Sequence, residues 1–397
     1  MTSDAAPDPL GALPDSSGGD VRAGGLPPRS SLSPRQRLVV DASALGDVAV
    51  RTAVASMLGV AMAPAVGAAA LHRAESQRER DNLAFYAALA AEHDAAKSFP
   101  APTARPRVTA RRANPLAERV AHRKVENISF TSSFEAVNPS VRSQWHALSR
   151  NNVVQAQHWR HDDGPRPTLC VIHGFLGSAY LLNGRFFSLP WYYRAGYDVL
   201  LYTLPFHGRR GEKYSPFSGY GYFAHGLTGF AEAMAQAVHD FRTILDYLRH
   251  TGVDRIALTG VSLGGYTASL IAAVDDRLEA VIPNCPVVAP HATFDEWFPA
   301  NKVIALGLRL ADISWESLVA GLAYHCPLNY QPVVARERRL IITGLGDRFA
   351  PPRQAEMLWQ HWDHCLLHWF PGSHLLHINK ADYLRRMTQF LQEFMFG

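Results

Sequence analysis

Short apolar runs alternate with helix-like segments through the C-terminal two thirds of this chain. The runs lie at 167–174, 197–205, 255–262, 278–285, 338–347 and 365–372. A long amphipathic stretch, GFAEAMAQAVHDFRTILDYLRH, separates two of them over 229–250. Strands that alternate with helices build a mostly parallel sheet with helices on both faces. Buried parallel strands read as continuous apolar runs, as these do. The pattern predicts an α/β fold for residues 125–397.

The N-terminal part differs in composition. Residues 1–35 are rich in Gly, Pro, Ser and Asp, which predicts a disordered leader. They lack the basic-then-apolar order of a signal peptide, so we expect a cytoplasmic location. Residues 36–124 are expected to form a helical extension that ends in a basic, Pro-punctuated linker over 101–124. Neither segment shows the strand pattern of the C-terminal part.

One stretch of the extension leaves three interpretations open. Residues 53–71, AVASMLGVAMAPAVGAAAL, carry no charge and are long enough to span a bilayer. Ala and Gly dominate, however, and the Leu, Ile and Phe residues that drive insertion are few. A soluble or buried helix is favoured over a membrane-associated helix and over a true span. Peripheral contact of residues 53–124 with an anionic membrane surface is the functional alternative.

Charge and cysteine usage restrict the function class. The net charge of +4 is small for 397 residues and no nucleic-acid-binding motif is present, so we expect no nucleic-acid partner. The cysteines are scattered and form no CxxC pair, which favours reduced, buried thiols over a disulfide framework or a metal cluster. They are Cys170, Cys285, Cys326 and Cys365. We expect neither a metal nor a cofactor, and the sequence leaves the oligomeric state open.

A glycine-rich turn surrounds Ser262. Residues 260–264, GVSLG, fit G-x-S-x-G directly after the strand-like RIALT and directly before the helix-like YTASLIAA. That strand-to-helix context is what the motif requires. Glycines on either side avoid clashes in a tight turn that strains the serine backbone. The helix N-terminus offers backbone N–H groups to a developing oxyanion. The motif predicts that Ser262 is a nucleophile, although a tight turn alone is the simpler interpretation.

With this context, residues 125–397 resemble the α/β-hydrolase fold superfamily, in its serine esterase and lipase-like branch. In that family an acid and a histidine follow the serine in chain order. The resemblance places the acid at Asp347, after LIITG, and the histidine at His374 in the PGSH turn. An Asx turn or helix cap is the alternative role for Asp347. His368 and His377 are expected to be structural.

The resemblance also implies an oxyanion hole. Its N–H donors would be Leu263, after the serine, and Phe175 in the His-Gly loop, with Leu176 in reserve. His173 is expected to fix that loop by hydrogen bonds rather than transfer protons.

Four residues are candidate substrate contacts: His173, Leu176, His207 and Arg209. A structural role is favoured for His207, which belongs to a second His-Gly turn. Arg209 and its neighbour Arg210 are interpreted as solvated charge, with an anionic substrate group as the alternative.

The remaining segments bear on the substrate. Aromatic residues in the loop 212–226 could line an acyl pocket, and a small helical cap is expected over 290–325, where the family often inserts one. The resulting hypothesis is a serine hydrolase that cleaves a small-molecule or lipid carboxylic ester, preferably with an apolar acyl chain, through an acyl-enzyme on Ser262. An acyltransferase of the same fold is the alternative. A membrane-associated, non-enzymatic interaction protein is the alternative from another class.

Overall fold

The computed structural model describes residues 25–113, 125–177, 179–378 and 380–396. Most of the expected leader, residues 1–24, lies outside them, as does 114–124 of the expected linker. The strands in chain order are β1 (Thr109–Arg112), β2 (Val125–Thr131), β3 (Val153–Trp159), β4 (Thr168–Ile172), β5 (Asp198–Thr203), β6 (Ile256–Val261), β7 (Leu278–Asn284), β8 (Leu340–Gly344) and β9 (Leu366–Phe370).

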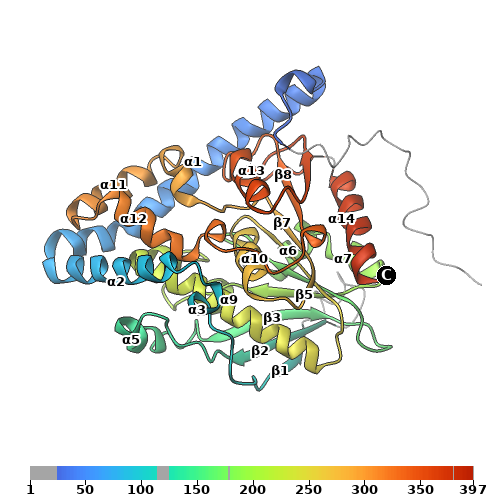
Figure 1. Cartoon of the computed structure of the whole chain (residues 1–397), viewed down its shortest axis with the longest axis horizontal. Coiled ribbons are helices and arrows are strands. Elements are labelled where there is room, and N and C mark those ends of the chain that lie inside the picture. Colours follow the sequence, from blue (N-terminus) through green and yellow to red (C-terminus); the bar gives the residue numbers. More distant parts are fainter. Residues whose placement is uncertain (1–24, 114–124, 178, 379, 397) are drawn as a thin grey trace, which may run out of the picture.

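The α-helices surround these strands (Figure 1). They are α1 (Pro34–Leu71), α2 (Arg73–Ala91), α3 (Ala95–Ser98), α5 (Arg142–His146), α6 (Tyr180–Phe186), α7 (Leu189–Arg194), α8 (Gly221–Ala224), α9 (Gly226–His250), α10 (Leu263–Val274), α11 (Ala300–Leu310), α12 (Trp315–Leu322), α13 (Pro352–His361) and α14 (Lys380–Met395).

All the strands belong to one sheet, in the order β1-β2-β3-β5-β4-β6-β7-β8-β9. Strands β5, β4, β6, β7, β8 and β9 run parallel to one another, whereas β1, β2 and β3 are antiparallel additions at one edge. Every apolar run singled out in the sequence contains one strand of the parallel part. The predicted α/β-hydrolase architecture, a mostly parallel sheet covered by helices, is therefore confirmed.

The sheet is buried on both faces. On β4, Cys170 and Ile172 belong to the core under α9, α10 and α13, whereas Leu169 and Val171 belong to the core under α7 and α14. Successive side chains of a strand point to opposite faces, so a strand covered on both sides needs apolar residues throughout. The predicted burial of the cysteines is also confirmed, and all four are free.

The sheet begins earlier than the sequence suggested. Strand β1 lies inside the segment expected to be a solvated linker, yet Ala110 and Arg111 pair with Ile128 and Asn127 of β2. Its side chains are exposed, so it carries no apolar pattern, and its backbone pairs with β2 at the edge of the sheet. A boundary between extension and catalytic domain at residue 125 would cut this β1–β2 pair.

The helical extension is also built into the fold. Ser33 begins α1 with a capping box, accepting from the N–H of Gln36 while the Gln36 side chain accepts from the N–H of Ser33. Helices α11 and α12 occupy the segment 290–325, which we call the cap segment. Figure 1 shows α1 and α2 lying alongside these two helices, and α1 packs against α11 while α2 packs against α12.

Candidate active site

Ser262 occupies a strained turn between β6 and α10. Its backbone has φ 56° and ψ −117°, a region that non-glycine residues rarely adopt. A Cβ atom on Gly264 would lie 2.2 Å from the carbonyl oxygen of Ile172, and one on Gly260 would lie 2.3 Å from the carbonyl oxygen of Gly264. The turn therefore admits only glycine at both positions. It sets Ser262 at the N-terminus of α10, where backbone N–H groups are unpaired within the helix.

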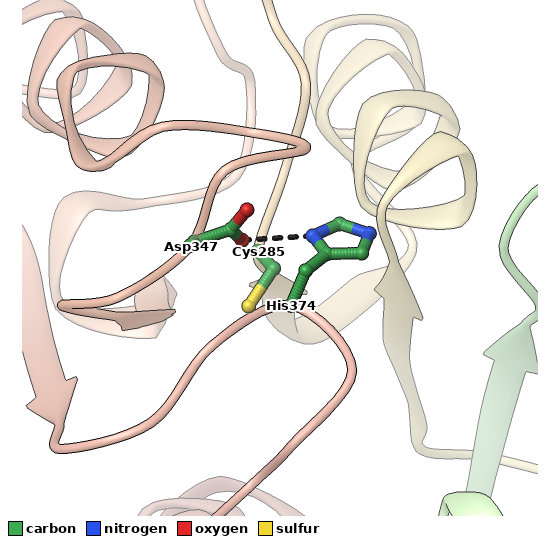
Figure 2. A group of neighbouring side chains, drawn as sticks. All are labelled: Cys285, Asp347 and His374. Atoms are coloured by element: carbon green, nitrogen blue, oxygen red, sulfur yellow. Dashed lines mark hydrogen bonds and ion pairs between the residues drawn. The ribbon is translucent and has the colours of Figure 1, made fainter. Parts of the chain in front are cut away.

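Asp347 and His374 follow the ends of β8 and β9. Because the carboxyl ends of parallel strands meet at one edge of a sheet, both residues lie at the edge that carries Ser262. The Nδ1–H of His374 donates to Asp347 Oδ2 at 2.8 Å. Figure 2 shows this bond, with the second ring nitrogen, Nε2, on the side of the imidazole away from the carboxylate. The pair predicted from the sequence thus forms, and its geometry leaves Nε2 available.

The other carboxylate oxygen of Asp347 holds its own loop. Asp347 Oδ1 accepts from the backbone N–H groups of Phe349, at 2.9 Å, and Ala350, at 2.8 Å. This is the Asx turn considered in the sequence, so the two roles are divided between the two oxygens. The ring of Phe349 in turn stacks on the His374 imidazole, with centroids 4.9 Å apart. The loop that carries the acid therefore also orients the histidine.

The protonation of His374 is controlled by its neighbours. Burial lowers the pKa of His374, but the charge of Asp347 and its hydrogen bond raise it, with a further contribution from the charge of Asp47. The carboxylates outweigh burial, so the pKa lies above the ordinary value of 6.5. An imidazole tuned in this way is a stronger base than a free histidine.

Cys285 completes the group drawn in Figure 2. Its Sγ, an Asp347 carboxylate oxygen and a His374 ring nitrogen all lie within 4.8 Å of one another, a spacing that a metal ion could bridge. Burial, together with the charge of Asp347, raises the pKa of the Cys285 thiol well above its usual range. Metals bind the thiolate. Because Nδ1 of His374 and Oδ2 of Asp347 are already engaged in their own hydrogen bond, the group fits a hydrogen-bonded Asp347–His374 pair beside a neutral thiol better than a metal site.

An apolar cavity of about 340 Å³ opens onto Ser262. Its walls come from α1, α8, α9, the start of α10 and the cap segment, and Leu58, Phe230, Leu308 and Leu318 are typical of them. Glu79 of α2 also borders it, but its carboxylate accepts from the N–H groups of Leu227 and Thr228 at the start of α9. The charge of Glu79 is thus engaged in capping α9 and leaves the lining essentially apolar.

Both predicted oxyanion donors border this cavity. Leu263 and Phe175 line it together with Ser262. The His-Gly loop approaches the serine closely, because a Cβ on Gly174 would lie 3.4 Å from the Cβ of Ser262. The His-Gly loop with Phe175 and the start of α10 with Leu263 therefore both lie beside Ser262.

The four candidate substrate contacts are not among the residues that line this cavity, and their contact with a substrate stays a prediction. His173 Nδ1–H donates to the carbonyl of Gly174 at 2.8 Å, and its Nε2 accepts from the N–H of Leu204 at 3.2 Å. Burial lowers the pKa of His173 to about 4, so it stays neutral. His207 is fully buried and donates to the carbonyl of Pro205. Both histidines fix loops, as the favoured interpretation held.

Leu176 and Arg209 are also not among the residues that line the cavity. Leu176 has φ 68° and is 38% exposed, outside the cavity lining. Arg209 is exposed to solvent. Arg210, which the sequence could not separate from it, is fully buried and pairs with Asp240 at 2.6 Å. The structure therefore separates the two arginines: Arg210 is a buried ion-pair partner, whereas Arg209 carries its charge at the surface.

One residue of the site escaped the sequence interpretation. Asp47 of α1 is 1% exposed, and its carboxylate binds the loops that carry Asp347 and His374. Its only signal in the sequence is an isolated charge in the apolar stretch between Asp41 and Arg51. Nothing local shows where that charge is neutralised.

Comparisons with known proteins agree with the fold. Residues 167–309 match a family model described as alpha/beta hydrolase fold. Two curated relatives, both uncharacterized proteins of Mycobacterium tuberculosis, are 31% identical over 280 residues, which is 66% of this chain and 63% of theirs. The chain therefore matches less than two thirds of the length of these relatives.

Solved structures show the same architecture. Acetyl xylan esterase 1 from a Thermoanaerobacterium species superposes with a TM-score of 0.54 at 15% identity, covering 78% of this chain and 93% of that protein. An acetyl xylan esterase from a Paenibacillus species gives 0.52 at 16% identity, covering 77% and 93%. At such identities the likeness concerns the fold. Together with the matched family model, it shows that the chain has the α/β-hydrolase fold.

Proposed function

We propose that this protein is a serine hydrolase that cleaves carboxylic esters with an extended apolar acyl chain. One arrangement carries the proposal. Ser262 sits in its strained turn at the mouth of an apolar cavity, at the same sheet edge as the hydrogen-bonded pair Asp347–His374.

The first half of the reaction transfers the acyl group to the protein. Nε2 of His374 takes the proton of Ser262 Oγ as this oxygen attacks the ester carbonyl carbon. The N–H groups of Leu263 and Phe175 stabilise the negative carbonyl oxygen of the tetrahedral intermediate. The intermediate collapses, the bond to the alcohol oxygen breaks, and His374 gives its proton to the leaving alcohol. Asp347 holds the imidazole in the required tautomer and stabilises its charged form.

The second half releases the acid. His374 takes a proton from a water molecule, whose oxygen attacks the acyl carbonyl carbon. The bond to Ser262 Oγ breaks and the proton returns to the serine. In this cycle the ester and water are the reactants, and the groups of this chain that act on them are the three side chains and the two backbone N–H groups named above.

The cavity supports an extended acyl chain rather than a short one. A volume of about 340 Å³ is far more than a two-carbon acetyl group fills. Each CH₂ group that leaves water for such a lining gains about 0.8 kcal/mol. No cationic side chain lines the cavity within the described residues, which disfavours a substrate with an anionic group there.

A fluorophosphonate probe together with Ser262→Ala tests the assignment. We expect the probe to label the native protein and the Ser262→Ala variant to lose both labelling and ester hydrolysis. Ser269→Ala is the matched control, because Ser269 lies on the same helix with its hydroxyl donating to the carbonyl of Gly265. It should label and hydrolyse like the native protein. Equal labelling of native and Ser262→Ala protein would refute the proposal.

A panel of nitrophenyl esters tests the substrate class. We expect kcat/KM to rise from acetate to medium and long acyl chains. Adding acceptor alcohols to the same assay measures transfer against hydrolysis. Predominant transfer would assign the site to an acyltransferase instead, since the two reactions share the acyl-enzyme.

A further inference from the structure

One face of α1 is directed at the loops that carry the acid and the histidine. Val40, Ser43, Asp47 and Arg51 recur at helical spacing along it. The contact is close, because a Cβ on Gly346, next to the acid, would lie 2.8 Å from both Ser43 Oγ and the carbonyl oxygen of Val40. The helix therefore packs directly on the acid loop.

The Asp47 carboxylate joins that loop to the histidine loop. Its Oδ1 accepts from Ser373 Oγ at 2.8 Å and from the N–H of Leu375 at 3.3 Å. Its Oδ2 accepts from the N–H of His374 at 2.8 Å and from the N–H of Arg348 at 3.1 Å. Three of these donors belong to His374 and its two neighbours in the chain, and the fourth, Arg348, directly follows Asp347.

A carboxylate suits this position for a physical reason. A buried charge persists only where hydrogen bonds replace its hydration, and the four donors supply them. In return, backbone N–H groups that would otherwise be buried without partners are satisfied. Asparagine has the same shape but only one acceptor oxygen, so it would set an amide N–H against two of these donors.

We propose that Asp47 is a positioning residue of the reaction: it holds the Asp347 and His374 loops at the separation that proton transfer requires. The N-terminal helix is then part of the catalytic unit rather than an appendage. This inference rests on the proposed serine-hydrolase function.

The charge of Asp47 also acts on His374. The groups facing His374 are Asp347 after β8, the neutral thiol of Cys285 after β7, Asp47 on α1 and, from its own loop, His377, whose Nε2–H donates to the His374 carbonyl. The guanidinium of Arg348 donates to the backbone carbonyl of Asp347. The negative charge of Asp47 adds to that of Asp347 in raising the pKa of His374. Neutralising Asp47 therefore weakens the base as well as loosening its loop.

Asp47→Asn tests the inference, with Asp41→Asn as the matched control. Asp41 lies on the same helix, but its side chain is 48% exposed and pairs with Arg29 at the surface. For Asp47→Asn we expect kcat to fall about 10- to 100-fold with KM nearly unchanged, since misplaced reacting groups slow chemistry more than binding. The acid limb of the pH profile should move to lower pH. Asp41→Asn should match the native protein in both.

The outcomes separate positioning from a structural role. Native kcat in Asp47→Asn would overturn the inference, and so would a lower kcat with an unmoved acid limb and a lowered Tm. If Asp47→Asn does not fold, Ser373→Ala keeps the charge and removes one donor. A kcat about 5-fold lower is then expected, and an unchanged kcat would overturn the inference. Residual full activity in Ser262→Ala would instead refute the proposed function itself.

Discussion

The chemistry proposed for Ser262 depends on the protonation of one imidazole. His374 must be neutral to accept the serine proton, and its surroundings favour the charged form because Asp347 and Asp47 both act on it. The same hydrogen bond that orients the ring therefore sets the pH at which it works. The Asp347 hydrogen bond thus orients the imidazole and raises its pKa, and the charge of Asp47 adds to that rise.

The raised pKa of His374 predicts that activity begins to fall on the acid side of the pH profile at a pH above 6.5. The pKa of His374 is raised, so the neutral, active form is lost as the pH falls through a value above 6.5. We expect kcat/KM for a nitrophenyl ester to drop tenfold per pH unit below that point. His368→Gln is the control, because burial lowers the pKa of His368 to about 4. If kcat/KM declines only below pH 6, or if the pH of the decline changes in His368→Gln, the assignment of His374 as base is contradicted.

Helix α1 contributes to the site over most of its length. Its first half carries Asp47 to the loops of Asp347 and His374, and its second half lines the apolar cavity with Leu58, Met62, Val66 and Ala69. Both contributions come from the face that packs against the rest of the fold, where Ala55 and Leu58 are buried. A shift of this helix would therefore alter the proposed base, His374, and the apolar cavity together.

The far part of the cavity should set the acyl chain length. Ala69 packs near Leu308 and Leu322 in a cluster separate from the one around Phe175. We expect Ala69→Phe to lower kcat/KM for a dodecanoate ester about 10-fold, as loss of two buried CH₂ groups implies. A butyrate ester should be unaffected.

Ala70→Phe is the matched control for this test, since Ala70 is exposed and borders no part of the cavity. Its chain-length profile should be native. An equal loss for both esters in Ala69→Phe would show that the far part of the cavity does not hold the acyl chain.

The whole molecule keeps several histidines neutral inside its core. Burial lowers the pKa of His158 and His325 to about 3, and neither ring nitrogen of His158 has a hydrogen-bond partner among the described residues. Such groups take up protons in the unfolded chain near pH 6.5 but not in the folded one. The folded state therefore loses stability as the pH falls below 6.5, by about 1.4 kcal/mol per pH unit for each histidine.

Replacing His158 should reduce this acid sensitivity. We expect the free energy of unfolding to fall between pH 7 and pH 5 in the native protein, and to fall about 2 kcal/mol less in His158→Phe. Urea denaturation at the two pH values measures both. His146→Phe, at an exposed position, is the control and should behave like the native protein. An identical loss in His158→Phe would show that His158 is protonated in the folded state.

One helix of the structure bears on the predicted cellular location of the protein. Of the described helices, α1 is the one long and apolar enough to cross a membrane. One of its faces is committed to the site through Asp47, while Val60 and Leu71 are exposed. A cytoplasmic location and peripheral membrane contact through residues 53–124 both stay predictions.

Local sequence determined the parallel sheet and the three residues of the proposed triad. Strands covered on both faces must be apolar throughout, and the turn around Ser262 admits only glycine at 260 and 264. Asp347 and His374 could be found because each directly follows a strand in the order the family resemblance supplies. The strands, the glycine turn and the two residues that follow strands are each determined by sequence within a few positions of the feature itself.

Tertiary structure alone decided the rest. The exposed pairing of β1 and the burial of Arg210 against Asp240 have no local pattern that distinguishes them. Asp47 is the clearest case, since it acts on Ser373 from 326 positions away. A buried carboxylate is stable only where the fold brings donors to it, so its partners are specified by packing between distant segments rather than by periodicity within one.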